Sequence, residues 1–178
     1  MTPTLQHIKN MKTSIIILSA LSMTFASFKT ISPEDRIAKG DAAAERMATS
    51  VVTAFQHRSL QEYTALFPSV EAFHKIMEMN SSLYGANLEE AKEEFEMQYT
   101  KEVLPALNQS FKTVIAQGIK EGIDWSTIKF VSVEFNEQSH IAPATITFSS
   151  NGKEYRLEFE KTLLINGEWK VSQYVKLS

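Results

Sequence analysis

The sequence predicts an α+β fold in which N-terminal helices pack on a four-stranded antiparallel meander sheet. Two observations carry this prediction. Apolar residues recur at helical spacing from about residue 33 to 118. From about residue 130 they alternate with polar residues, which is typical of strands that have one dry and one wet face. The helices of the first half therefore have to cover the dry face of the sheet in the second half.

The helical half divides into four predicted helices. The first spans about residues 33–57 and opens with Ser-Pro-Glu-Asp, a capping serine followed by proline and two acids. Short helices are expected at 60–67 and from 69 to about 80, each opened by a serine. A long apolar stripe predicts a helix over 88–118, in which Pro105 should cause a kink or a break. This long helix is the expected cover of the sheet.

Each of the four predicted strands places its apolar residues on one face. These dry-face residues are Val131, Val133 and Phe135; Ala144, Ile146 and Phe148; Tyr155, Leu157 and Phe159; and Trp169, Val171 and Val175. The alternation also constrains the turns, because facing residues of an antiparallel pair lie on the same side of the sheet.

Two Asn-Gly pairs are expected to be hairpin turns of different lengths. A two-residue turn at 151–152 pairs dry residues with dry residues, which favours a type I′ turn. A two-residue turn at 166–167 would mix the faces. A three-residue loop at 165–167 with a bulge is therefore predicted, so that Leu163 pairs with Trp169.

The N-terminal segment has the pattern of a secretory signal peptide. Residues 11–26 read MKTSIIILSALSMTFA, a lysine and a short apolar run that ends in small residues. This run is shorter than the roughly 20 apolar residues of a membrane span. We expect 1–26 to be a signal peptide and 27–178 to be a single exported domain, periplasmic or secreted. A retained N-terminal anchor is the alternative, and whether Met1 or Met11 is the start stays open.

The composition excludes several classes of function. The 178 residues contain no cysteine, which excludes a disulfide scaffold, a cysteine zinc site and a thiol nucleophile. The net charge of −3 argues against nucleic acid as a partner. Eleven Phe, five Tyr and two Trp are enough for an aromatic core. The exported domain is therefore expected to be stabilised by packing alone.

The ionisable residues form no recognisable catalytic or metal-binding motif. The histidines His7, His57, His74 and His140 lack metal spacing. The sequence also lacks an acidic calcium loop, a G-x-S-x-G elbow and a glycine-rich phosphate loop. The glutamates of 89–96, with Lys92 and Lys101 among them, are interpreted as a solvated helix face. We therefore predict no catalytic residue, no metal and no cofactor.

The candidate ligand-binding residues are Lys161, Gln173, Tyr99 and Trp125. Lys161 and Gln173 interrupt the predicted dry stripe of the sheet, and a buried amine needs a carboxylate, water or a ligand. Both would project into a cavity between the sheet and the helices. Tyr99 and Trp125 would line this cavity. The alternatives are that Lys161 extends to solvent at a sheet edge and that the aromatic residues belong to the core.

The order of helices and meander, closing on Asn-Gly-Glu-Trp-Lys-Val at 166–171, resembles the nuclear-transport-factor-two-like (cystatin-like) α+β cone. It is similar in particular to the small exported bacterial members of unknown role, over about residues 40–178. Enzymatic relatives such as ketosteroid isomerases and polyketide cyclases place an Asp or His base and a Tyr inside the cone. Non-catalytic relatives use the same concavity to bind ligands or partners. The predicted dry face carries no acid, so the resemblance assigns no catalytic residue here.

Three functional hypotheses follow. The first is a non-enzymatic exported domain that binds a small apolar ligand or a protein partner near Lys161 and Gln173. The second is a cone-fold isomerase, dehydratase or hydrolase, which requires His57, His74 or Lys161 beside a tyrosine hydroxyl in a cavity. The third is a structural protein of the cell envelope, a homodimer included, that docks through the wet face of the sheet. The charged residues of that face are Arg156, Glu158, Glu160, Lys170 and Lys176.

Overall fold

The computed structural model describes residues 33–135 and 141–178, with side chains described from residue 42 onward. Its helices are α2 (Pro33–Gln56), α3 (Leu60–Thr64), α4 (Val70–Met79), α5 (Leu88–Gln98) and α6 (Leu104–Lys120). Its strands are β1 (Lys129–Phe135), β2 (Ile141–Ser150), β3 (Lys153–Ile165), β4 (Glu168–Val171) and β5 (Val175–Leu177). This helices-then-sheet order confirms the predicted α+β class. The predicted signal peptide lies outside the described residues.

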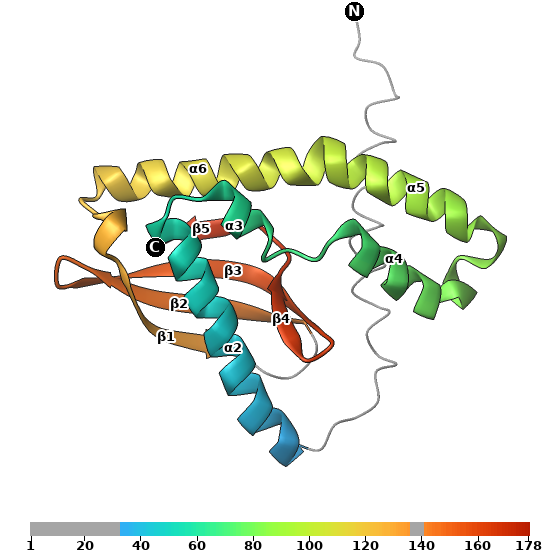
Figure 1. Ribbon diagram of the computed structural model, residues 1–178, viewed down its shortest axis with the longest axis horizontal. Helices are drawn as coiled ribbons and strands as arrows, with labels where there is room; N and C mark the ends of the chain where they lie inside the picture. The colour runs from blue at the N-terminus through green and yellow to red at the C-terminus, as the bar shows by residue number, and fades with distance from the viewer. Residues whose placement is uncertain (1–32, 136–140) are drawn as a thin grey trace, which may run out of the picture.

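The sheet is an antiparallel meander in the order β1-β2-β3-β4, and β5 also pairs with β3. The predicted fourth strand is thus divided into β4 and β5, because the chain leaves the sheet at residues 172–174. Figure 1 shows α2 crossing one face of the curled sheet and α6 running along the side that carries β5. The cover of the sheet therefore comes from α2 and α6 together, and α5 extends beyond the sheet.

Both Asn-Gly turns are two residues long. The prediction for 151–152 is therefore confirmed, and the prediction of a three-residue loop at 165–167 is wrong. At 151–152, Ser150 faces Lys153, and both turn residues have positive φ angles of 52° and 75°, as a type I′ turn requires. At 166–167, Ile165 faces Glu168, and the turn residues again have positive φ angles, of 53° and 80°. The predicted three-residue loop does not form, and Leu163 faces Lys170 instead of Trp169.

The change of face takes place inside β3 instead. Around Pro143 the strand β2 advances by two residues while β3 advances by three, from Phe159 to Thr162. Proline has no N–H to give to the ladder, so a bulge opposite Pro143 is the natural place for the extra residue. The bulge turns Leu163 away from the inner face of the sheet, and its side chain packs with α4 and α5. A second register shift in β1 leaves Val131, predicted to be dry, 45% exposed.

Pro105 does not break the long helix. Helix α5, a π-helical segment Tyr99–Val103 and α6 form one rod (Figure 1). The N–H of Leu104 donates to the carbonyl of Tyr99, five residues earlier. Pro105 has no backbone N–H to donate. The π-type bond of Leu104 maintains the helical hydrogen bonding up to the residue before it, so the helix continues.

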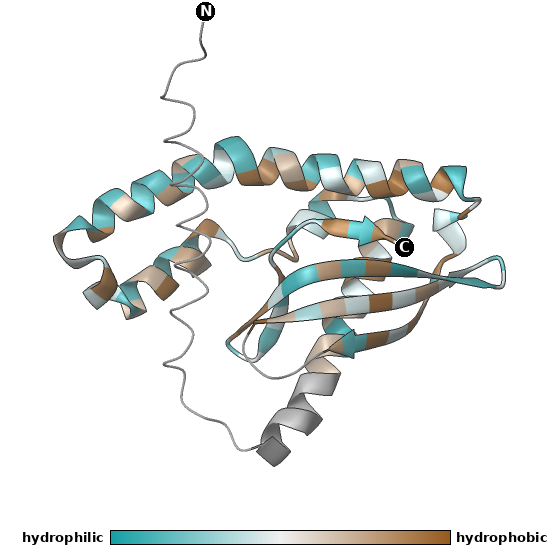
Figure 2. Cartoon of the chain, turned by 180° about the vertical axis from the view of Figure 1, so that it is seen from behind, coloured by the Kyte–Doolittle hydropathy of each residue, from teal (hydrophilic) through white to brown (hydrophobic). Residues whose placement is uncertain are grey.

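The main core lies between the inner face of the sheet and α2, α3 and α6. The Trp125 ring stacks between Phe55 and Phe148, with ring centroids 5.3 Å and 5.5 Å away. Gly118 of α6 makes room for this ring, because an added Cβ would overlap Cζ2 of Trp125 and lie 2.8 Å from its Cε2. In Figure 2, teal and brown segments alternate along the strands, as the predicted alternation requires.

Helices α4 and α5 form a helical hairpin, defined here as residues 70–103, that projects beyond the sheet (Figure 1). The hairpin has its own small hydrophobic cluster, which three strand residues join: the buried Leu163 and the half-buried Ile141 and Ile165. The buried members of this hairpin cluster are Phe73, Ile76, Met77, Phe95 and Leu163. The described part of the chain thus has two hydrophobic clusters, and the bulge in β3 turns the buried strand residue Leu163 toward the second.

Candidate functional site

Lys161 and Gln173 lie close together where β4 ends. The N–H and the hydroxyl of Ser172 donate to the carbonyl oxygen of Lys161 at 3.4 Å and 3.0 Å. Gln173 follows in the break between β4 and β5, and both predicted site residues are half-buried. Lys161 lies in the bulge of β3, so it does not continue the row of Phe159 as the sequence pattern suggested.

Trp125 and Tyr99 lie in different clusters. Trp125 is completely buried in the main core, where its Nε1 donates to the carbonyl of Ile115 at 3.1 Å. Tyr99 packs against the hairpin cluster, and its hydroxyl donates to the carbonyl of Pro68 at 3.3 Å. The carbonyl of Lys161 thus bonds to Ser172, the chain neighbour of Gln173, and the two aromatic candidates lie elsewhere.

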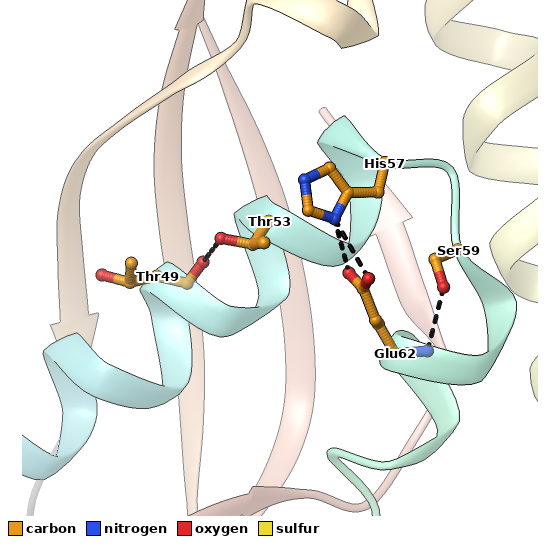
Figure 3. A network of polar contacts seen from close by, with 5 residues as sticks. All are labelled: Thr49, Thr53, His57, Ser59 and Glu62. Carbon is orange, nitrogen blue, oxygen red and sulfur yellow. Dashed lines mark hydrogen bonds and ion pairs between the residues drawn. The ribbon is translucent and has the colours of Figure 1, made fainter.

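His57 makes a surface contact (Figure 3). Its Nδ1 lies 2.9 Å from a carboxylate oxygen of Glu62, and the two side chains are 55% and 46% exposed. Glu62 holds this position because α3 starts at a serine cap, in which its N–H donates to Ser59 Oγ at 3.2 Å. The contact joins the ends of two helices and does not face the core.

His74 of α4 is half-buried, and its Nε2 has no hydrogen-bond partner among the residues that the structure describes. Its ring lies edge-on to Phe95 at 6.5 Å, so it belongs to the hairpin. His140 lies outside the described residues. Within the described part of the chain, no tyrosine hydroxyl bonds to a histidine or a carboxylate. The arrangement that the enzymatic hypothesis requires is not found there.

Two donors in the main core lack a partner among the described residues. Tyr63 is completely buried, and its ring centroid lies 4.9 Å from that of Phe111 and 5.4 Å from that of Phe67; its hydroxyl is the first of the two donors. Burial raises the pKa of Tyr63 well above its ordinary value. The other donor is Nε1 of Trp169, whose side chain is 5% exposed and packs on Phe135. An unsatisfied buried donor costs about 1–3 kcal/mol.

The charged groups on the outer face of the sheet largely satisfy one another. Lys176 forms an ion pair with Glu160 across β5 and β3 and holds the pKa of that carboxyl below its ordinary value. Glu158 accepts a hydrogen bond from the Ser178 hydroxyl at 2.7 Å. This face is hydrophilic and self-paired, which gives little support to its predicted role as a docking surface.

The hairpin exposes large apolar side chains that the sequence analysis did not single out. Met79 and Leu83 at its tip are 69% and 65% exposed, and Met97 on α5 is 48% exposed. A helical projection would have found Met97, because it lies opposite Leu88 and Phe95 on α5. In the sequence these residues are hidden among apolar neighbours that do pack.

Lys92 is not part of a solvated face, contrary to the sequence interpretation. Its side chain is 13% exposed, and its Nζ bonds to Glu78 of α4 at 2.8 Å and to Glu89 at 2.9 Å. Lys92 holds the pKa of the Glu78 carboxyl below its ordinary value, through a hydrogen bond and charge attraction. The three residues tie the two helices of the hairpin together.

Within 33–135 and 141–178, no group of three or more His, Asp or Glu side chains is arranged to hold a metal ion. None of the helices in the same ranges combines the length and apolarity needed to cross a membrane.

No protein-family model matches the sequence, and no curated protein matches it significantly. The crystal structure of a cystatin-like protein from Ruminococcus gnavus ATCC 29149 is similar, with 12% sequence identity and a TM-score of 0.45. The match covers 82% of this chain and 46% of the other, so this chain spans less than half the length of that protein. The described architecture is helices followed by a curled antiparallel sheet.

Proposed function

We propose that this chain is an exported, non-enzymatic domain that acts by binding another protein, with the hairpin as its binding element. One observation carries the proposal. Of the six large apolar side chains exposed on the described chain, three lie on the hairpin: Met79, Leu83 and Met97. The hairpin projects beyond the sheet, where a partner has access to it (Figure 1).

The exposed residues of the hairpin are not explained by its own packing. Phe73, Ile76 and Phe95 already form its buried cluster. A single exposed apolar residue needs no explanation, but Met79 and Leu83 lie together at one tip. Methionine is enriched at protein interfaces, since its flexible thioether adapts to a partner. These properties favour a docking element over a merely structural hairpin.

Site-specific photocrosslinking in the host cell tests this proposal. A photoreactive phenylalanine analogue at Leu83 should give a discrete crosslinked protein, and the same analogue at exposed Glu154 on the sheet should not. Equal melting temperatures of the two labelled proteins would show that both are folded. Absence of any product from Leu83 and from Met97 in folded protein would refute the proposal.

Export is the second part of the proposal and rests on the signal-peptide pattern of residues 11–26. Intact mass measurement of protein purified from its host tests it. Cleavage after Ala26 would leave residues 27–178. A mass that retains the leader, in protein found inside the cell, would overturn this part and leave the binding proposal standing.

A small ligand is the second candidate, because Tyr63 and Trp169 have buried donors without partners. A ligand that offers an acceptor to either donor would remove the penalty of leaving it unbonded. Native mass spectrometry of host-purified protein should then show a retained small mass, and Tyr63→Phe should reduce it. A protein of bare polypeptide mass would exclude this candidate.

A further inference from the structure

We propose that the partner of the hairpin presents a basic amphipathic helix, which docks along the outward face of α5. This inference rests on the proposed function and names the chemistry of the partner. The outward face is defined here as the exposed Glu90, Glu93 and Met97 together with Glu94, which is half-buried and accepts a hydrogen bond from Gln98 at 3.2 Å.

The helical period places these residues on one side of α5. Its inward side carries Leu88, Ala91 and Phe95, which pack in the hairpin cluster. Met97 follows Glu93 and Glu94 by four and three positions, so the carboxylates flank it on the adjacent turn. An apolar centre with an acidic border is complementary to a helix that has an apolar stripe bordered by Lys or Arg.

The charge of the predicted mature protein is concentrated on this element. Residues 70–103 contain eight Glu and three Lys, a net charge of −5. The remainder of 27–178 contains thirteen acidic and thirteen basic residues, a net charge of zero. The entire negative excess of the domain therefore lies on the hairpin, and it would attract a cationic partner to this element.

The hairpin does not neutralise this charge internally. Lys92 turns inward to Glu78 and Glu89, so its charge is not available to the outward face. Glu90 and Glu93 form no ion pair with any residue that the structure describes. Both side chains are exposed and free to meet a Lys or Arg of the partner.

The size of α5 sets the size of the partner segment. Eleven residues of α-helix extend about 16 Å, or three turns. A helix of about three turns that packs alongside would cover Met97 and place several basic side chains beside the acidic border. A metal ion is a poorer occupant, since no set of acids in the described chain is arranged to hold one.

Peptide binding to the mature protein, residues 27–178, tests the inference by fluorescence anisotropy. The probe is a labelled peptide of Leu and Lys with Leu at helical spacing, compared with a scrambled peptide of the same composition. The amphipathic peptide should bind at least about tenfold more tightly, and its affinity should fall as salt is raised. Equal binding of both peptides would overturn the inference.

Charge-matched variants separate this face from the total charge. Glu90→Lys with Glu93→Lys should weaken peptide binding by about tenfold or more, because each reversal places repulsion at the contact. Glu134→Lys with Glu154→Lys makes the same change in net charge at exposed sheet positions and should leave affinity within about twofold. Met97→Ser should also weaken binding. Equal losses in the two charge-reversal pairs would contradict a specific site.

The outcomes distinguish the two proposals. If Leu83 crosslinks to a protein in the cell and the amphipathic peptide does not bind, protein binding stands and the basic helix is wrong. If the peptide binds only the sheet or binds both charge variants alike, the assignment to α5 is wrong. Circular dichroism melts of each variant confirm that a loss of binding is not a loss of fold.

Discussion

The main core and the hairpin cluster bury their apolar residues to different degrees. In the main core, Phe55, Phe148 and Trp125 are completely buried, and helices and sheet contribute alike. In the hairpin cluster, each buried residue keeps 4% to 8% of its surface exposed, and one buried strand residue, Leu163, connects it to the sheet, with the half-buried Ile141 and Ile165 beside it. Because few buried contacts hold the hairpin, it should open at a lower free energy than the rest of the domain.

The difference suggests a division of labour. The main core gives the domain its stability, and the hairpin can present side chains to a partner without disturbing that core. Both tryptophans, Trp125 and Trp169, belong to the main core. Tryptophan fluorescence therefore reports on the main core alone, and amide hydrogen exchange can report on the hairpin separately.

The largest expected effect is on the main core. Gly118→Ala would drive a Cβ into the Trp125 ring, which is stacked on both sides and has no space to move. We expect a loss of about 3 kcal/mol in the free energy of unfolding, measured by urea denaturation. Ala116→Ser, at an exposed position of α6, is the control and should change stability by less than about 0.5 kcal/mol. A similar small change for Gly118→Ala would contradict the close packing of the ring.

A smaller and local effect is expected in the hairpin. Phe95→Ala removes a ring whose centroid lies 4.6 Å from that of Phe73. This loss should destabilise the hairpin by about 2 kcal/mol. Hydrogen exchange in α4 and α5 should become faster, while the tryptophan fluorescence of the folded protein stays unchanged. If the fluorescence changed together with exchange, the two clusters would form one cooperative unit, and the comparison would be wrong.

Two hydroxyl deletions should act in opposite directions. Tyr63→Phe removes a buried donor without a partner, so stability should stay the same or rise by up to about 1 kcal/mol. Tyr99→Phe removes a hydrogen bond to Pro68, so the hairpin should lose about 1 kcal/mol. Urea denaturation measures the first and hydrogen exchange the second. A clear loss in Tyr63→Phe would indicate that its hydroxyl has a partner in solution.

The smallest expected effect is on the pH dependence of the hairpin. Lys92 lowers the pKa of Glu78 from its ordinary value of 4.5 in the folded protein. A lowered folded-state pKa stabilises the hairpin above the ordinary pKa, and this stabilisation is lost as pH falls through the folded value. The rate of amide hydrogen exchange in α4 should therefore rise relative to the rate in α6 below about pH 4.5. Lys92→Gln should remove this difference between the two helices, and an unchanged pH profile in that variant would contradict the role of the ion pair.

Much of the fold follows from local pattern. The α+β order, the start of α3 at Ser59 and the tight turn at 151–152 all agree with the sequence-based predictions. Each of them depends on residues that are near neighbours in the chain. Helical spacing, a serine cap and Asn-Gly between two alternating runs act over a few residues, so the sequence is sufficient to predict them.

The second turn shows where local pattern is insufficient. Uninterrupted alternation along residues 153–165 predicts a bulge in the turn at 165–167. The bulge instead lies within β3, opposite Pro143 of the neighbouring strand β2. Only the pairing of the two strands reveals this position. The candidate site differs from its prediction for the same reason. The bulge turns Leu163 toward the hairpin and removes Lys161 from the row of inward-facing residues that contains Phe159.

Spacing and capping within short segments thus determine the elements of this protein and the apolar side of each one. Long-range packing decides which apolar side is covered, because α2 and α6 cover the inner face of the sheet while Met97 on the outward face of α5 stays 48% exposed. Met97 and Phe95 are both apolar residues of the same helix, and helical spacing places them on opposite sides of it. Spacing does not contain the packing partner: Phe95 is covered because α4 lies against its side of the helix.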